Sequence, residues 1–171
     1  MAGILVFVEQ RGGEIRKASL QALSEAHRLA AGGSVAAVIA GEGIGDAAGS
    51  LGAYGAQKVF CADDANLKNY SAEGYAAVVA KAVEEFGPSA VFFSATAMGR
   101  DLAPRVGARL GVGVLADVVG IEVEGETFVV KRPVYSGKAF VTADGAGSTP
   151  QVISLRPNVF AAEETGGSAE V

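Results

Sequence analysis

The chain has 171 residues, of which half are hydrophobic and 24 are glycine, and its 14 Lys and Arg stand against 19 Asp and Glu, a net charge of −5. A domain of this size buries roughly 70% of its unfolded surface, and the acidic balance, without a basic stripe, disfavours nucleic acid as a partner. Its one cysteine, Cys61, excludes an internal disulfide and the Cys-rich spacings of zinc, haem-attachment and iron–sulfur sites.

The first residues, MAGILVFVEQ, contain a short apolar run from Ile4 to Val8 and no basic leader. This run is too short for a signal peptide core or for a membrane span of about 20 residues. We therefore expect a cytoplasmic, bacterial protein without membrane insertion.

The first two thirds of the chain alternate strand and helix patterns. The run from Ile4 to Val8 is typical of a parallel strand covered on both faces. Apolar residues at helical spacing predict a helix from about Lys17 to Ala31, ended by Gly32 and Gly33. Further strands are predicted at 34–40, 58–62 and 89–95, helices at 71–86 and 102–110, and a short helical piece between 45 and 56. This order predicts a parallel sheet with right-handed crossovers and helices on both faces.

Beyond residue 112 the pattern changes to short β-branched and aromatic runs. Gly125-Glu126 and Ser136-Gly137 separate these runs as hairpin connections would. We expect them to extend the sheet with antiparallel strands at an edge, and residues 150–157 to add one more. The predicted fold is a three-layer, Rossmann-like α/β domain over residues 1–160, followed by a linker or tail over 161–171.

The loop GEGIGD, residues 41–46, follows a predicted strand, and Asp63 and Asp64 come about 20 residues later. A dinucleotide-binding fingerprint has a similar spacing. However, the glycine pattern is incomplete and the helix that follows is short, so a phosphate would meet a poor helix terminus. We favour a tight turn here, and an acidic capping loop at Asp63-Asp64 over a metal pair.

The sequence shows no catalytic constellation and no metal site. Gly137-Lys138 lacks the other residues of a Walker phosphate loop. His27 has no nucleophile or metal-ligand partner at helical spacing, which favours a surface histidine, and Cys61 is interpreted as a small buried residue. We therefore predict no enzyme activity for the chain.

The stretch ATAMGRD, residues 95–101, follows the strand predicted at 89–95. In an open α/β sheet, ligands collect at such carboxyl ends. A structural explanation is also available, because Thr96 or Asp101 would cap the next helix, Gly99 would permit a sharp turn, and Pro104 is tolerated in a first helical turn. The residues alone leave both interpretations open.

Three segments resemble the amino-terminal domain of the electron transfer flavoprotein alpha subunit. They are SATAMGRDLAPRVGARLGVGVLADV, KRPVYSGKAF and VISLRPNVF, and the likeness extends from Ile4 to about Phe160. The resemblance implies an adenine nucleotide alpha hydrolase-like fold. It also implies a heterodimer with a beta subunit, in which electrons pass from flavin dehydrogenases, including those of fatty acid oxidation, to a membrane-bound quinone reductase.

In that family most FAD contacts lie in a carboxyl-terminal domain that has no counterpart in these 171 residues. The resemblance therefore implies FAD in the complete heterodimer and no cofactor bound by this chain alone. We expect a scaffold domain that packs on the beta subunit and seats the FAD domain. The candidate subunit or domain contacts are Arg100, Asp101, Arg132, Tyr135 and Arg156, with capping and salt bridges inside the domain as the alternative for each. A free-standing nucleotide-binding module, using residues 41–46 and the strand end near Thr96, is the competing function.

Overall fold

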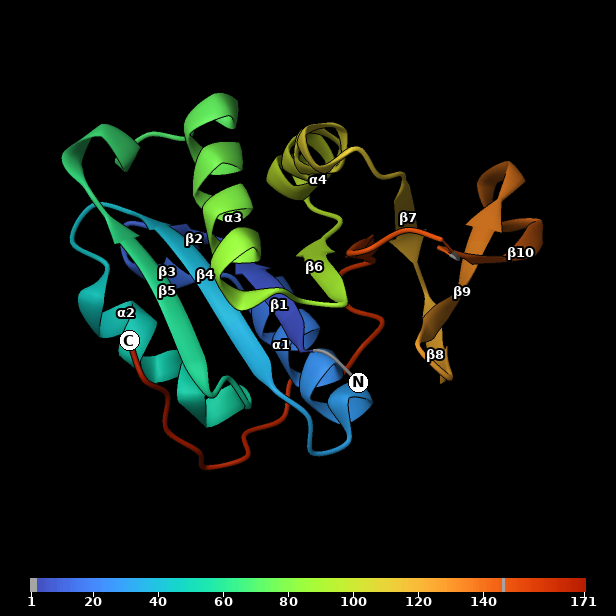
Figure 1. Cartoon of the computed structure of the whole chain (residues 1–171), viewed down its shortest axis with the longest axis horizontal. Helices are drawn as coiled ribbons and strands as arrows, with labels where there is room; N and C mark the ends of the chain where they lie inside the picture. Colours follow the sequence, from blue (N-terminus) through green and yellow to red (C-terminus); the bar gives the residue numbers. More distant parts are fainter. Residues whose placement is uncertain (1–2, 146) are drawn as a thin grey trace.

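Six parallel strands form a central sheet in the computed structural model, which describes residues 3–145 and 147–171 (Figure 1). They are β1 (Ile4–Val8), β4 (Val35–Gly41), β5 (Lys58–Asp63), β6 (Ala90–Ser94), β7 (Val114–Val118) and β11 (Gln151–Leu155). Their order across the sheet is β5-β4-β1-β6-β11-β7, and every pairing is parallel.

Helices cover both faces of this sheet (Figure 1). The helix α1 (Lys17–Ala30) and the short α2 (Gly45–Ser50), with the 3-10 turn η1 (Leu51–Tyr54), lie on one face. The helices α3 (Ala72–Phe86) and α4 (Ala97–Leu110) lie on the other. A further 3-10 turn, η2 (Ala65–Leu67), follows β5. This arrangement confirms the predicted three-layer, Rossmann-like α/β fold.

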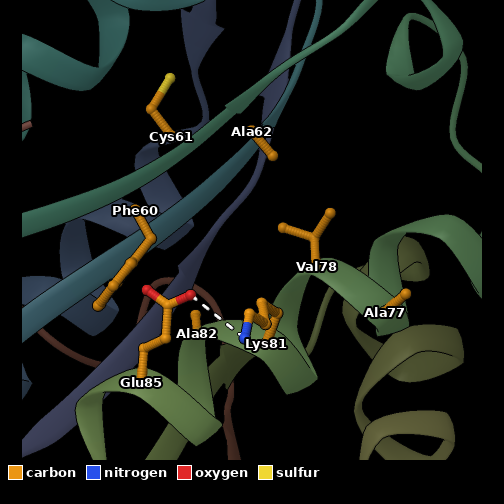
Figure 2. A pocket seen from close by; sticks show the side chains of 8 residues that line it. All are labelled: Phe60, Cys61, Ala62, Ala77, Val78, Lys81, Ala82 and Glu85. Carbon is orange, nitrogen blue, oxygen red and sulfur yellow. Dashed lines mark ion pairs between the residues drawn. The ribbon is translucent and has the colours of Figure 1, made fainter.

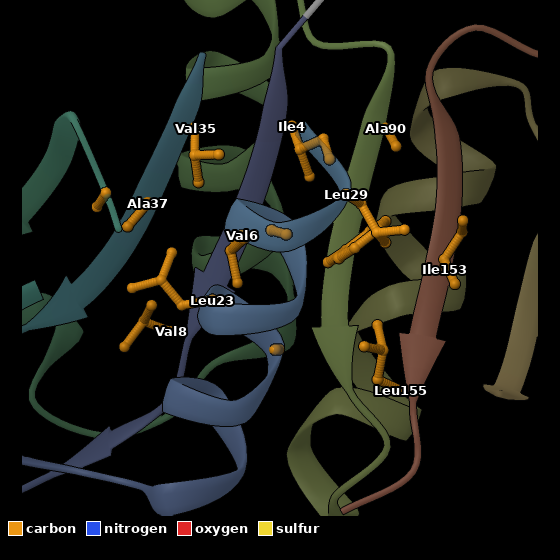
Figure 3. Packing of buried hydrophobic residues seen from close by; sticks show 14 of the residues in the cluster. Ile4, Val6, Val8, Leu23, Leu29, Val35, Ala37, Ala90, Ile153 and Leu155 are labelled. Atoms are coloured by element: carbon orange, nitrogen blue, oxygen red, sulfur yellow. The ribbon is translucent and has the colours of Figure 1, made fainter. Parts of the chain in front are cut away.

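The strand β1 shows why a continuous apolar run is needed at the centre of the sheet. Side chains alternate between the two faces of a strand. Ile4, Val6 and Val8 pack in the core beneath α1, while Leu5 and Phe7 pack in the core beneath α3 and α4. Figure 3 shows the first core, in which Leu23 and Leu29 of α1 lie over the sheet.

Helix boundaries follow capping residues. Ser71 precedes α3, and its Oγ accepts a hydrogen bond from the Gly74 amide at 3.4 Å. The helix predicted at 102–110 begins earlier, because Thr96 is the N-cap of α4. Pro104 therefore lies inside the helix and not in its first turn, so the carbonyl of Arg100 lacks the amide donor four residues later.

The antiparallel strands form a sheet of their own, which corrects their expected place at the edge of the main sheet. This small sheet has the order β10-β9-β8 and contains β8 (Gly120–Glu124), β9 (Thr127–Val134) and β10 (Ala139–Asp144). The predicted connection at Gly125-Glu126 joins β8 to β9, and η3 (Tyr135–Gly137) joins β9 to β10. Ile121, Phe128 and Val130 are buried and attach the small sheet to the core beneath α1.

The last strand was also expected as an antiparallel edge strand, and it is neither antiparallel nor at an edge. The strand β11 lies between β6 and β7 and pairs parallel with both. All five of its residues are buried. Val152 belongs to one core, and Ile153 and Leu155 belong to the other. A strand with apolar residues on both faces is stabilised inside a sheet, where both faces are covered.

Two features of the structure were not predicted from the sequence. A two-residue hairpin, β2 (Gln10–Arg11) and β3 (Glu14–Ile15), turns at Gly12 and Gly13, which both have positive φ. The segment 161–171 lies along the first half of the chain. The Thr165 amide donates to the Ala53 carbonyl at 2.7 Å, and the Val59 amide of β5 donates to Glu170 at 2.7 Å. The division into a domain and a linker stays a prediction.

Candidate functional site

The strand order reverses between β1 and β6, which is where ligands bind in open α/β sheets. At this point the Thr96 hydroxyl donates to Oε2 of the buried Glu9 at 2.7 Å and accepts from the Gly99 amide at 3.0 Å. Thr96 therefore caps α4 and ties the end of β6 to the residue that follows β1. Its oxygen is engaged within the domain, which favours the structural interpretation of residues 95–101.

A hollow of about 560 Å³ opens beside this point. It is lined by residues just after β1, by residues just after η2 and by the first turns of α4. On its wall Tyr70 donates to Oδ2 of Asp101 at 2.6 Å, and Arg105 donates to Oδ1 at 3.2 Å. These two bonds, with that from Tyr70 the stronger influence, hold the pKa of Asp101 below its usual value. Asp101, predicted as a subunit or domain contact, thus has two partners inside the domain.

The loop 41–46 does not offer its amides to a phosphate. The Gly43 amide donates to Oδ1 of Asp63 at 2.7 Å, and the Ile44 amide donates to Oδ2 at 2.9 Å. Asp64 accepts from the Asn66 amide at 2.8 Å at the start of η2. The acidic pair therefore caps backbone, as favoured from the sequence. Because a carboxylate already occupies these donors, the loop does not fit the pyrophosphate of FAD or of another dinucleotide.

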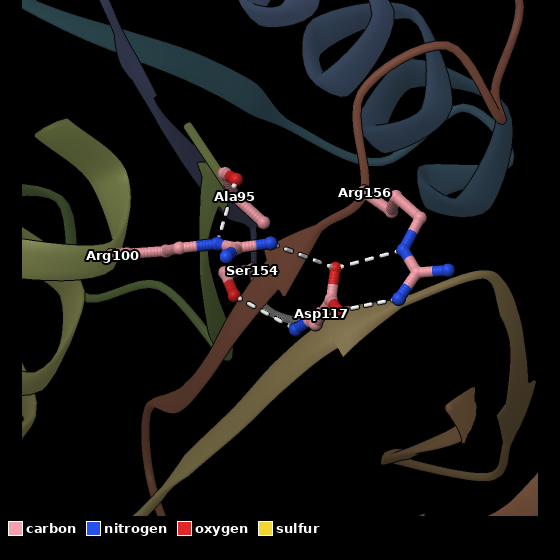
Figure 4. A network of polar contacts seen from close by, with 5 residues as sticks. All are labelled: Ala95, Arg100, Asp117, Ser154 and Arg156. Carbon is pink, nitrogen blue, oxygen red and sulfur yellow. Dashed lines mark hydrogen bonds and ion pairs between the residues drawn. The ribbon is translucent and has the colours of Figure 1, made fainter. Parts of the chain in front are cut away.

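A second polar site lies where β6, β11 and β7 end, and its centre is Asp117 (Figure 4). Arg156 holds the Asp117 carboxylate with two parallel bonds, from Nε at 2.9 Å and from Nη2 at 2.6 Å. Arg100 of α4 approaches the same carboxylate at 3.7 Å and donates from Nε to the Ala95 carbonyl at 3.1 Å. Two of the predicted contact residues, Arg100 and Arg156, thus meet on the carboxylate of Asp117, which was not among the predicted contacts.

A local irregularity of the sheet aims Asp117 at these arginines. The pairing of β7 with β11 shifts register beside Asp117, which has a φ of 60°. Its amide donates to the Ser154 hydroxyl at 3.1 Å. Such a bulge redirects a side chain that would otherwise point into a core. The signal available in the sequence was a single carboxylate inside the apolar strand VLADV.

Hydrogen bonds and nearby charges hold the pKa of Asp117 below its usual value. The bonds from Arg156 contribute most, and the charges of Arg156, Arg100 and Arg132 act in the same direction against the effect of burial. A carboxyl whose pKa is lower in the folded state stabilises the fold above its unfolded pKa and loses this contribution as the pH falls through the folded pKa.

We expect Asp117→Asn to lower the free energy of unfolding at pH 7 by about 1–2 kcal/mol, because it removes a charged bidentate pair whose Arg156 side chain is 40% exposed. The difference between the wild type and the variant should shrink between about pH 5 and about pH 1. Urea unfolding at a series of pH values measures it. Glu126→Gln, at an exposed hairpin turn, is the control. A difference that does not change with pH would contradict the assignment.

The remaining predicted contacts lie in or near the small sheet. Arg132 of β9 is partly buried, and its Nε is buried without a hydrogen-bond partner among the described residues. Tyr135 is 81% exposed at the connection between β9 and β10. The structure therefore brings Arg100 and Arg156 to Asp117, leaves Asp101 at the hollow near β1, and places Tyr135 at the surface.

Other candidates from the sequence contribute no reactive group. Cys61 lines an apolar groove of about 370 Å³ between β5 and α3, with Phe60 and Val78 on its walls (Figure 2). Burial, and then the charge of Asp63, raise the pKa of the Cys61 thiol, which disfavours the nucleophilic thiolate. His27 is exposed on α1.

Residues 3–145 and 147–171 contain no group of three His, Cys, Asp or Glu side chains placed to hold a metal ion. None of the helices described there is long and apolar enough to cross a bilayer.

A family model and several known proteins that match the chain all carry the name electron transfer flavoprotein. A family model described as electron transfer flavoprotein domain matches residues 4–171. The chain is 39% identical over 158 residues to an electron transfer flavoprotein subunit alpha of Bacillus subtilis, covering 92% of this chain and 46% of that protein. It is 39% identical over 171 residues to a subunit alpha of Syntrophomonas wolfei, covering 100% of this chain and 53% of that protein.

A third relative has a different name. The chain is 36% identical over 165 residues to the Lactate dehydrogenase (NAD(+),ferredoxin) subunit LctC of Acetobacterium woodii, covering 95% of this chain and 40% of that protein. The chain thus spans about half the length of the curated relatives it matches.

Proposed function

Because this chain belongs to the electron transfer flavoprotein domain family, we propose that it acts as the scaffold domain of an electron transfer flavoprotein alpha subunit. The comparisons confirm the predicted resemblance to the amino-terminal domain of that subunit. In the proposed role the domain packs on a beta subunit and seats the domain that holds FAD. It acts as part of an electron carrier and not as a catalyst.

The observation that carries the proposal is an apolar patch on the hairpin of β9 and β10. Tyr135 is 81% exposed and Phe140 is 55% exposed. Exposed aromatic groups gathered in one patch are typical of interaction sites. We name Tyr135 and Phe140 the hairpin patch.

The backbone at this patch is held in an uncommon conformation. Tyr135 and Ser136 have φ values of 51° and 56°, in the left-handed region that side chains other than glycine rarely adopt. Gly137 follows with a φ of 85°. Strained residues of this kind gather at functional sites. The conformation supports the hairpin patch as a contact surface, with Tyr135 as its most exposed group.

We further propose that the FAD contacts come from the second domain. The loop 41–46, the one segment that resembles a dinucleotide fingerprint, already binds Asp63 through its amides. When FAD is bound, it would accept and release the electrons. This chain would hold that carrier in place between flavin dehydrogenases and an acceptor such as a quinone reductase. The name of the Acetobacterium relative supports a link to dehydrogenases.

The proposal is tested by assembly. The purified chain is mixed with the cognate beta subunit and with the separately expressed FAD domain, and the mixture is separated by gel filtration with detection of flavin absorbance. We expect one yellow complex that contains all three polypeptides. Components that elute separately would contradict the scaffold role.

Two variants that each replace an exposed apolar residue by aspartate test whether the hairpin patch is the contact surface. Phe140→Asp should weaken assembly at least tenfold, because a charge would be buried in an apolar interface whose aromatic anchors dominate the affinity. Val159→Asp is the control, because Val159 is an exposed apolar residue outside the hairpin, 45% accessible. Equal affinities of the two variants would show that the hairpin patch is not the contact surface.

A further inference from the structure

The outer edge of the main sheet is the strand β5, which pairs with β4 on its inner side. On its outer side, at its first residues, lies the last part of the chain (Figure 1). The Glu170 amide donates to the Gln57 carbonyl at 3.0 Å, and the Val59 amide donates to the Glu170 carbonyl at 2.7 Å. These two bonds form a parallel bridge between Lys58 and Glu170. The chain thus enters the position of a further parallel strand.

Contacts with α1 and η1 bring the chain to this position. The Glu163 amide donates to Oγ of Ser24 in α1 at 3.0 Å. In η1 the backbone of residues 168–169 lies so close to Gly52 that a Cβ atom there would overlap it. The course of the chain towards β5 is therefore held by packing and by hydrogen bonds on the face of α1 and α2.

Backbone groups further along β5 face the same side as the bridge. The amides and carbonyls of alternate residues point to the same side of a strand. Because the Val59 amide points to Glu170, the Val59 carbonyl and the Cys61 amide also point outward. These groups lie opposite the positions that would follow Val171. An edge that presents a row of amides and carbonyls is a template for another strand.

An apolar groove lies beside this part of the edge, on the face that α3 covers (Figure 2). Its volume is about 370 Å³. The strand contributes Phe60 and Ala62, and the helix contributes Ala77, Val78 and Ala82. Lys81 and Glu85 also line it and form an ion pair at 3.6 Å. The groove therefore offers apolar surface next to the outward-facing backbone of β5.

The register of the bridge decides which side chains would fill the groove. Lys58 and Phe60 share one face of β5, and Nζ of Lys58 lies over the Phe60 ring at 4.9 Å from its centroid. Lys58 lies opposite Glu170. The position opposite Phe60 is therefore the first after Val171, and the position opposite Ala62 is the third. Side chains at these two positions would face α3 and the groove, because Phe60 and Ala62 pack on that side.

We propose that the β5 edge and the groove bind the segment that follows Val171 in the longer alpha subunit, as a parallel strand with apolar side chains at its first and third positions. The chain spans about half the length of its relatives and matches the amino-terminal domain. Its own continuation is the occupant, because Glu170 already has the direction and register of such a strand. The polypeptide would then leave this domain at the carboxyl end of β5, near Asp63. The inference rests on family membership and not on the proposed scaffold role.

The first test compares the chain of 171 residues with a version that carries the next four residues of the longer subunit. Hydrogen exchange of the Cys61 amide, followed by nuclear magnetic resonance, reports whether a strand pairs there. We expect the four residues to slow this exchange at least tenfold. Unchanged exchange would overturn the proposal. Slowing that increases with protein concentration would assign the edge to a second copy of the chain and would also overturn it.

The second test examines the register with two designed extensions of equal composition. Val-Thr-Val-Thr after Val171 places both valines towards the groove, whereas Thr-Val-Thr-Val places them on the opposite face. We expect the first to slow exchange of the Cys61 amide at least tenfold more than the second. Equal effects of the two extensions would contradict a strand that fills the groove.

A variant of the groove completes the second test. Val78→Ser in the chain that carries Val-Thr-Val-Thr should remove most of the slowing, because it takes apolar surface from the groove. Val129→Ser is the control, because Val129 is a partly buried valine of β9 in the small sheet. The same loss of slowing in both variants would show that the groove does not contribute.

Discussion

Gly99→Ala is expected to lower the free energy of unfolding by about 3 kcal/mol. Gly99 lies in the first turn of α4, and a Cβ atom there would overlap the carbonyl oxygen of Ser94 at the end of β6. The obstructing atom belongs to the backbone of a central strand, so a side-chain rotation does not relieve the overlap. Either α4 moves away from β6, or the strand is displaced.

Urea unfolding of both proteins measures this effect, with Gly49→Ala as the matched control. Gly49 is exposed in α2, and a Cβ atom there would meet nothing within 4 Å. Because alanine favours a helix over glycine, the control should gain about 0.5–1 kcal/mol. Similar stability of Gly99→Ala and the wild type would mean that α4 does not pack as closely as described.

The close approach of α4 to β6 at Gly99 also explains the role of the segment Gly99-Arg100-Asp101. The missing side chain lets α4 begin directly against β6, so that Thr96 caps the helix and contacts Glu9. Asp101 then faces Tyr70, and Arg100 faces Asp117. A motif that resembles a ligand loop is therefore first a tight junction, and it presents Arg100 as a consequence.

Phe128→Ala is expected to cost about 3–5 kcal/mol, because it removes a fully buried aromatic side chain and leaves a cavity. The Phe128 ring packs edge-to-face on Phe92 of β6, with 5.8 Å between ring centroids. This contact joins the small sheet to the main domain. Hydrogen exchange of the β9 amides should accelerate more than that of the β1 amides.

Phe140→Ala is the matched control for this prediction. Phe140 belongs to the same small sheet, but it is 55% exposed and the Lys131 ammonium lies over its ring. Surface substitutions of this kind change stability by about 0.5 kcal/mol or less. Equal losses in the two variants would contradict the distinction between an anchoring face and an exposed face of the small sheet.

The two faces of the small sheet have different environments. Phe128 and Val130 fix the small sheet on the core, and the same face continues to Arg132. The far end of the hairpin carries Tyr135 and Phe140 at the surface.

The local sequence predicted most of the helices and the hairpin turn at Gly125, but not the start of α4 or the turn at Gly12-Gly13. Gly87 ends α3 in a left-handed conformation, Ser71 begins it, and Gly125 turns β8 into β9. The run from Ile4 to Val8 also predicted a central strand, because apolar residues on both faces require cover on both faces. These signals lie within a few residues of the structure they specify, which is why a pattern reveals them.

Strand order and the polar sites depended on contacts between distant parts of the chain. The strand β11 enters between β6 and β7 although it is the last in sequence, and Arg156 meets Asp117 across 39 positions. The sequence around Asp117 and the sequence around Arg156 do not indicate that these two side chains form an ion pair, because only the order of the strands in the sheet brings them together. Pairing energy acts between neighbours in space, so only the tertiary structure decided where β11 lies and which charges surround Asp117.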